Sequence, residues 1–170
     1  MNTRLKQGIR AIFSFIQPVD YRLVGEILDP SLMILFRRMR RSEQLHSLRV
    51  MKTLVAQGYR EIDVLIAALL HDCGKSRYLF TLPERVLVVL VKKLAPKAFL
   101  RWSAGEPEGW KRSFVISAQH PRWSAEDMAA AGASILAIAL AQRHQDSLMG
   151  VPTNEADRLL LALQAADDDN

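Results

Sequence analysis

The chain has 170 residues, 49% of them hydrophobic, and its 23 lysines and arginines outnumber its 18 acidic residues. This length suits one domain with a substantial core. A single cysteine excludes an internal disulfide, and the N-terminal sequence lacks the apolar core and cleavage site of a signal peptide, so we expect a cytoplasmic protein. No apolar run is long enough to predict a membrane-spanning helix.

Apolar residues recur at helical spacing, with glycines and prolines between the periodic segments, so the sequence predicts an all-α fold, a single-domain helical bundle. Residues 3–16 predict an amphipathic helix with cations between its apolar positions. Such a helix either docks on the domain or lies on an anionic membrane surface. Two further helices are expected, one before Asp29 and one over residues 31–41. Residues 1–41 together form a predicted N-terminal helical extension.

The next two predicted helices are joined by a short turn. Ser42 followed by Glu43 is typical of a helix start, and the apolar spacing then continues to Gly58. The following helix begins near residue 61 and ends at the His-Asp-Cys-Gly sequence of residues 71–74. Helices joined by a short turn pack antiparallel, so we expect the start of the first to meet the end of the second.

The middle segment, residues 78–112, contains one apolar and then basic helix over residues 84–94. The stretch that follows is rich in small, charged and turn-forming residues. Because the segment holds too little apolar material for a core of its own, we expect it to cover the domain rather than to form a second one.

The C-terminal part is predicted to begin with a loop that carries His120-Pro121 and runs to Gly132. A helix over residues 134–141 and a last helix after Pro152 are expected next. The last helix leads into three aspartates, residues 167–169, whose charges oppose the helix macrodipole at that end. These aspartates form either a solvated tail or part of a cation site.

An imidazole and a carboxylate stand side by side at His71-Asp72, where the apolar helix stops. Burial of an ionised carboxylate is costly unless a charge or hydrogen bonds compensate for it. The doublet therefore needs a partner, and a metal ion is one candidate. The antiparallel helix pair would bring His46 towards this doublet.

Three segments occur in a fixed order along the chain: the helix around His46, the sequence Leu69-Leu70-His71-Asp72-Cys73-Gly74-Lys75, and Ala166-Asp167 near the C-terminus. This ordered set resembles the HD-domain superfamily of metal-dependent phosphohydrolases, whose signature is a histidine, a His-Asp doublet and a distant aspartate. The resemblance covers about residues 42 to 169 and implies an HD-type helical domain over residues 42–170.

The resemblance also implies the metal ligands. Asp72 would bridge two ions. The implied ligands of the first ion are His46, His71 and Asp167, and those of the second are His120 and His144. The pairing with Ala166 favours Asp167 over Asp168 as the last ligand. The sequence departs from the family where a second consecutive histidine is common, since Gln145 follows His144.

Imidazole and carboxylate ligands suit Mn²⁺, Fe²⁺, Co²⁺, Ni²⁺ or Zn²⁺, so one or two divalent transition metals are the expected cofactor. Lys75, one turn after the doublet, and Arg49, on the face of His46, are candidates to contact a phosphate oxygen, with ordinary surface cations as the alternative. Cys73 is expected to pack as a small apolar residue.

The activity implied is hydrolysis of a phosphomonoester or phosphodiester, with a nucleotide as the expected substrate, by a metal-activated water. The alternative is a catalytically silent HD-domain module that binds a nucleotide or a signal molecule. Clusters of cations at residues 37–41, 92–101 and 111–112 form either solvated helix faces or a weak contact with an anionic membrane surface. The sequence contains no zinc-finger spacing and no RNA-binding aromatic motif, so it gives no indication that the protein binds nucleic acid.

Overall fold

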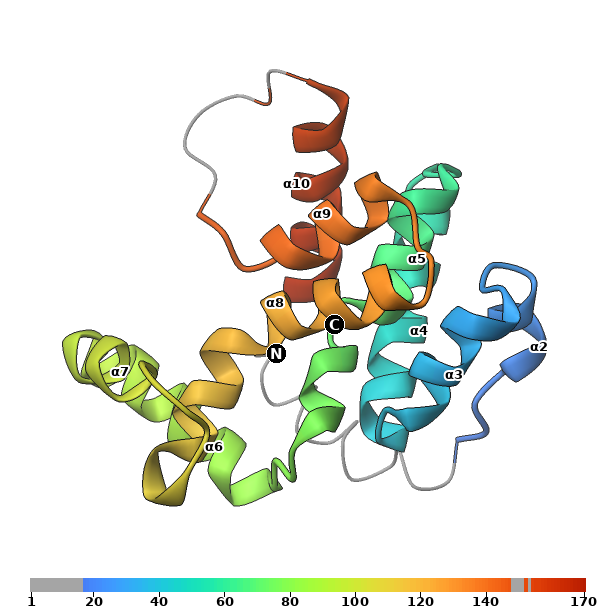
Figure 1. The fold of residues 1–170 in the computed structure, drawn as a ribbon. Coiled ribbons are helices and arrows are strands. Elements are labelled where there is room, and N and C mark those ends of the chain that lie inside the picture. Colours follow the sequence, from blue (N-terminus) through green and yellow to red (C-terminus); the bar gives the residue numbers. More distant parts are fainter. Residues whose placement is uncertain (1–16, 148–151, 153) are drawn as a thin grey trace.

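The computed structural model describes residues 17–147, 152 and 154–170. These residues form an all-α structure, as the sequence predicts, and no strand occurs among them (Figure 1). The helices are α2 (Tyr21–Gly25), α3 (Pro30–Arg38), α4 (Arg41–Ala56), α5 (Ile62–Leu70), α6 (Leu82–Leu94), α7 (Pro96–Trp102), α8 (Arg112–Ala130), α9 (Ile135–Arg143) and α10 (Glu155–Asp168), with short 3-10 helices η1 (Cys73–Arg77) and η2 (Gly109–Lys111). The helix predicted over residues 3–16 lies outside the described residues. Within the described part of the chain, no helix has both the length and the apolar composition needed to cross a membrane.

Local sequence signals set several helix ends. The carboxylate of Asp29 accepts a hydrogen bond from the backbone N–H of Leu32, and Pro30 occupies the first helical position of α3. Ser134 caps α9 and Asn154 caps α10 in the same way. Each cap satisfies a backbone donor that the first turn of a helix leaves unpaired.

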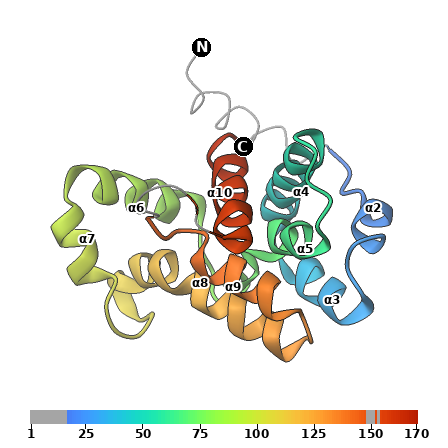
Figure 2. The same ribbon diagram turned by 90° about the horizontal axis from the view of Figure 1, so that it is seen from above.

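The main core lies between α2 to α5, α9 and α10. Helices α4 and α5 form an antiparallel pair, and α9 and α10 pack against it. Leu54, Leu69 and Leu163 from three of these helices are fully buried. Phe36 of α3 is buried in the same core, so residues assigned to the N-terminal extension take part in the core of the domain. Figures 1 and 2 both show α2 and α3 at one end of the molecule.

At the opposite end, α6 and α7 pack with the first half of α8 around a second, smaller core (Figure 2). We call α6, α7 and η2, residues 82–111, the lobe. Phe99 and Val88 of the lobe are buried against Phe114 of α8. The middle segment builds this core together with α8. Helix α7 was not predicted, because Pro96 looks like a helix stop and instead occupies the first helical position.

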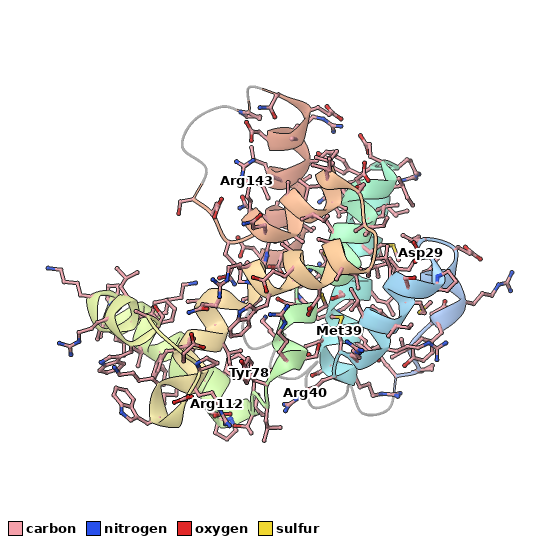
Figure 3. The ribbon with its side chains drawn as sticks, in the orientation of Figure 1. Asp29, Met39, Arg40, Tyr78, Arg112 and Arg143 are labelled. Atoms are coloured by element: carbon pink, nitrogen blue, oxygen red, sulfur yellow. The ribbon has the colours of Figure 1, made fainter. Side chains whose placement is uncertain are left out.

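Charged side chains tie the lobe to the rest of the molecule, and Figure 3 shows Arg40 and Arg112 near this junction. The guanidinium of Arg40 donates to the carbonyl of Phe80 over 2.6 Å, and that of Arg112 contacts the carboxylate of Glu84 at 2.6 Å. Glu84 also accepts hydrogen bonds from Thr81. Burial alone would raise the pKa of Glu84, but the bonds from Thr81 and Arg112 outweigh it and lower the pKa to about 2.

Two sequence predictions about helix extent are wrong. The helix expected over residues 31–41 ends at Arg38, because Met39 and Arg40 are extended and the N–H of Arg40 bonds to the carboxylate of Glu43, in the first turn of α4. The loop expected from His120-Pro121 to Gly132 is instead the second half of α8.

Helix α8 continues through Pro121 because a side chain replaces the missing hydrogen bond. Proline has no N–H to donate to the carbonyl four residues earlier, which belongs to Ser117. That carbonyl instead accepts from Nδ1 of His120, at 2.9 Å, and the carbonyl of Ile116 lies 3.1 Å from the same nitrogen. The freed backbone group is therefore satisfied inside the helix.

Candidate metal centre

The antiparallel pairing of α4 and α5 brings two of the predicted residues together. His46 lies in the second turn of α4, and His71 follows the last residue of α5. Their ring centroids are 5.6 Å apart, as the short turn between the helices predicts. His71 is completely buried, and Asp72, next in the chain, is 5% exposed.

Three more elements complete the cluster. α8 supplies His120, α9 is followed directly by His144, and α10 supplies Asp167 in its last turn. The carboxylate Oδ1 of Asp167 lies 2.7 Å from Nε2 of His46 and 3.6 Å from Nε2 of His71. All six residues predicted as ligands thus lie together, although they come from five segments of the chain.

The two oxygens of Asp72 face opposite halves of this cluster. Oδ2 lies 3.7 Å from Nε2 of His71, whereas Oδ1 lies 3.1 Å from Nε2 of His120 and 3.9 Å from Nε2 of His144. Donor atoms about 2.1 Å from one ion lie about 3.0–3.4 Å from each other in octahedral or tetrahedral geometry. The observed separations are close to this range, on both sides of the same carboxylate.

The buried histidines are held with one ring nitrogen turned towards the other donors. Nδ1 of His71 lies 3.0 Å from the carbonyl of Ala68, and Nδ1 of His144 lies 2.7 Å from the carbonyl of Ala141. His120 uses its Nδ1 in the same way within α8. A carbonyl accepts only from an N–H, so these bonds place a proton on Nδ1 and turn Nε2 towards the cluster, the orientation that metal-binding histidines need; on His71 a metal ion would take the place of the proton that the raised pKa puts on Nε2.

The surroundings of Nε2 of His71 are compatible with a bound cation. This nitrogen is buried and has no hydrogen-bond partner among the residues that the structure describes. An unsatisfied buried polar atom in a native protein needs an explanation, and a bound ion is one. Three overlapping sets of residues, each with its donor atoms within 4.8 Å of one another, can hold a metal ion: His46, His71 and Asp72; His71, His144 and Asp167; and Asp72, His120 and His144.

The charges of the cluster also favour a cation. Burial alone lowers the pKa of His71, but the carboxylates of Asp72 and Asp167 outweigh it and raise the pKa to about 9. Burial would raise the pKa of Asp167, yet His71 and His46 hold it well below its usual range. Burial and the neighbouring imidazoles lower the pKa of His144 to about 3, so this ring stays neutral and able to ligate.

Lys75 lies beside the doublet, with its Nζ 2.6 Å from Oδ2 of Asp72. Burial alone would raise the pKa of Asp72, but Lys75 and His71 hold it well below its usual range. Lys75 therefore contacts a predicted ligand in this structure, and its predicted phosphate contact stays a prediction. Arg49 is half-buried on α4 one turn after His46, and its role likewise stays a prediction.

Cys73 packs in the main core, as predicted, and burial raises the pKa of its thiol to about 12. A thiol with so high a pKa stays protonated, and the donor sets that can hold a metal do not include it.

Gly74 fixes the distance between the doublet and α8, a role that the sequence alone did not reveal. A Cβ at this position would lie 2.5 Å from the carbonyl oxygen of His120 and 2.6 Å from the backbone nitrogen of Ser124. The N–H of Gly74 donates to the hydroxyl of Ser124 over 2.9 Å. Glycine thus allows the backbones of η1 and α8 to approach closely enough for Asp72 to reach His120.

A pocket of about 280 Å³ opens beside the cluster, where His144 and Asp167 form part of its wall. The rest of the wall is polar and comes from α6, the segment after α9, and α10: Lys92, Gln145, Asp146, Gln164 and Asp168. In the sequence, Lys92 is only one of a run of basic residues. Its position on the wall of this pocket depends on the tertiary fold. Lys92 is the one cation among these lining residues and faces three carboxylates, Asp146, Asp167 and Asp168, so an anionic group would enter this pocket only together with bound cations.

Comparisons of the chain with protein-family models, with curated proteins and with solved structures gave no match.

Proposed function

We propose that the protein is a divalent-metal-dependent phosphohydrolase of the HD-domain type, which hydrolyses a phosphomonoester or phosphodiester, with a nucleotide as the expected substrate. The observation that supports this best is the position of Asp72, whose Oδ2 faces His71 and whose Oδ1 faces His120 and His144. A carboxylate in this position suits a pair of ions. Two divalent cations held in this way would supply a Lewis acid and lower the pKa of a water molecule that attacks phosphorus.

The residues divide into two groups of expected ligands. The first consists of His46, His71 and Asp72, with Asp167 beside His46 and His71, and the second of Asp72, His120 and His144. The mixture of imidazole and carboxylate donors favours Mn²⁺, Fe²⁺, Co²⁺, Ni²⁺ or Zn²⁺ over Ca²⁺.

The chain also supplies cations for a phosphate group. The ammonium of Lys75 lies at the cluster, and that of Lys92 lies on the wall of the adjoining pocket. A fixed positive charge near the reacting phosphate stabilises the charge that develops on its oxygens in the transition state. Lys75 would have to exchange its contact with Asp72 for one with substrate when a metal ion occupies that carboxylate oxygen.

The proposal is tested by metal analysis and phosphate release on the same preparations. We expect the purified protein to contain a divalent transition metal and to hydrolyse nucleotides or the generic substrates p-nitrophenyl phosphate and bis(p-nitrophenyl) phosphate. His71→Ala and Asp72→Ala should lose both properties. Asp169→Ala, which removes an exposed carboxylate at the end of α10, is the matched control and should keep them.

Two results would contradict the proposal in different ways. If His71→Ala and Asp72→Ala retain both metal and turnover, the cluster is not the active centre. If the wild-type protein binds metal and nucleotides but releases no phosphate or other product from any of them, the protein is a binding module and not a hydrolase.

A further inference from the structure

Helix α6 turns its apolar side outwards, which is unusual for a helix that packs on a protein core. Val88 faces the second core and is 3% exposed. The opposite side carries six large apolar residues that are 48–76% exposed: Leu82, Val86, Leu87, Val89, Leu90 and Leu94. We call these six residues the apolar face.

The apolar face is continuous. At about 100° per residue, its six side chains project over an arc of about 160° around the helix. Lys93 is the one charged residue of α6 in this arc. Leu100 of α7 and Trp110 of η2, elsewhere on the lobe, are also 69% and 65% exposed. Contiguous exposed apolar surface of this kind marks a site of interaction, whereas scattered exposed apolar residues do not.

The charges near the apolar face identify the partner. No acidic residue occurs from position 85 to position 105, whereas Lys92, Lys93, Lys97 and Arg101 all fall within residues 92–101. Of the three acidic residues in the lobe, Glu84 is paired with Arg112, and Glu106 and Glu108 lie beyond the end of α7. The lobe, residues 82–111, holds six lysines and arginines against three glutamates, so it combines apolar side chains with a net positive charge at one end of the molecule (Figures 1 and 2).

We propose that the lobe docks on an anionic membrane surface, with the apolar face of α6 at the boundary between lipid headgroups and acyl chains. Leucine and valine side chains would leave water there, and Lys93, Lys97 and Arg101 would contact lipid phosphates or carboxylates, as in interfacial amphipathic helices. A second copy of this chain is the alternative partner, because its exposed Asp168 and Asp169 could meet these cations, and the experiment below separates the two. This docking is independent of the proposed hydrolysis.

The experiment is co-sedimentation of the full chain with phosphatidylcholine vesicles that contain either no phosphatidylserine or about one third of it. We expect binding to the anionic vesicles only, reduced at least fivefold between 0.1 M and 0.5 M salt. Leu90→Glu/Leu94→Glu should reduce the bound fraction at least tenfold. These side chains are exposed, so the variant should keep the wild-type circular dichroism spectrum and melting temperature.

A matched control separates the apolar face from a general effect of charge. Ile34→Glu/Ile135→Glu adds the same two charges at residues that are 54% and 89% exposed on α3 and α9. This control should bind vesicles more than fivefold better than Leu90→Glu/Leu94→Glu does. The proposal is wrong if the two double variants lose binding equally, or if the wild-type protein does not bind anionic vesicles. It is also wrong if Leu90→Glu/Leu94→Glu dissociates a dimer seen by ultracentrifugation while vesicle binding is absent.

Discussion

Replacement of Gly74 by alanine should damage both the fold and the candidate metal centre. The added Cβ would meet the His120 carbonyl oxygen at 2.5 Å and the Ser124 nitrogen at 2.6 Å, about 0.9 Å and 0.8 Å closer than an ordinary contact of 3.4 Å. Both atoms belong to the backbone of a helix and cannot rotate away. The segment that carries Asp72 must therefore separate from α8.

The magnitude follows from this separation. Overpacking of a buried site costs about 1–3 kcal/mol of unfolding free energy, and in a protein of this size each kcal/mol lowers the melting temperature by about 2–4 °C. We therefore expect Gly74→Ala to melt about 2–12 °C below wild type without metal. The same separation moves Asp72 away from His120. Because a binding site tolerates displacements of only ~0.5 Å, metal binding that uses both residues should also become weaker.

The assay is thermal unfolding of metal-free protein, followed by calorimetric titration with Mn²⁺ and Zn²⁺. Gly25→Ala is the matched control, because its added Cβ would meet only the end of the Met33 side chain, at 3.6 Å. This control should match wild type in both measurements. If Gly74→Ala behaves like Gly25→Ala, the close approach of η1 to α8 is not what fixes the geometry of the cluster.

Three further predictions concern single side chains. Asp167→Asn should bind metal at least tenfold more weakly by calorimetry, whereas Asp168→Asn, at an exposed residue, should bind metal nearly as wild type. If Asp168→Asn loses the affinity instead, Asp168 and not Asp167 is the last ligand. Pro121→Ala supplies a backbone N–H that competes with Nδ1 of His120 for the carbonyl of Ser117. The His120 ring is then held less firmly, so metal affinity should fall about 10- to 100-fold without loss of thermal stability. Unchanged metal affinity would contradict this prediction. Glu84→Gln should cost about 1 kcal/mol in urea unfolding at pH 7. The pKa of Glu84 is about 2 in the folded protein and about 4.5 in the unfolded chain. The difference in unfolding free energy between wild type and variant should therefore be fully present above pH 4.5 and should shrink as the pH falls towards 2. A difference that does not change with pH would contradict this prediction.

The proximity of His46 to His71 could be predicted because it depends on local features. A short turn after Gly58 forces two amphipathic helices to pack antiparallel, and the turn is closed at Gly58 with a φ of 95°, a conformation that favours glycine. The all-α fold follows from the same periodicity. The remaining ligands could be grouped only through the resemblance to a family, because they are distant in sequence.

The errors arose where tertiary or side-chain contacts overrode a local rule. Pro121 suggested a loop, yet the ring of His120 satisfies the carbonyl that the proline frees, and the helix continues. Pro96 suggested a helix end but starts α7. The position of Lys92 beside the cluster depends on how the lobe packs on α8, which no spacing in the sequence encodes.

In the proposed function, Asp72 holds divalent cations between His71 on one side and His120 and His144 on the other. Anomalous diffraction from crystals grown with Mn²⁺, recorded on both sides of a suitable absorption edge, tests it most directly. We predict anomalous peaks about 2.0–2.3 Å from a carboxylate oxygen of Asp72 and from Nε2 of His71 or His120. Crystals saturated with Mn²⁺ that show no anomalous peak in the cluster, with Lys75 and the histidines still paired to the two carboxylates, would contradict it.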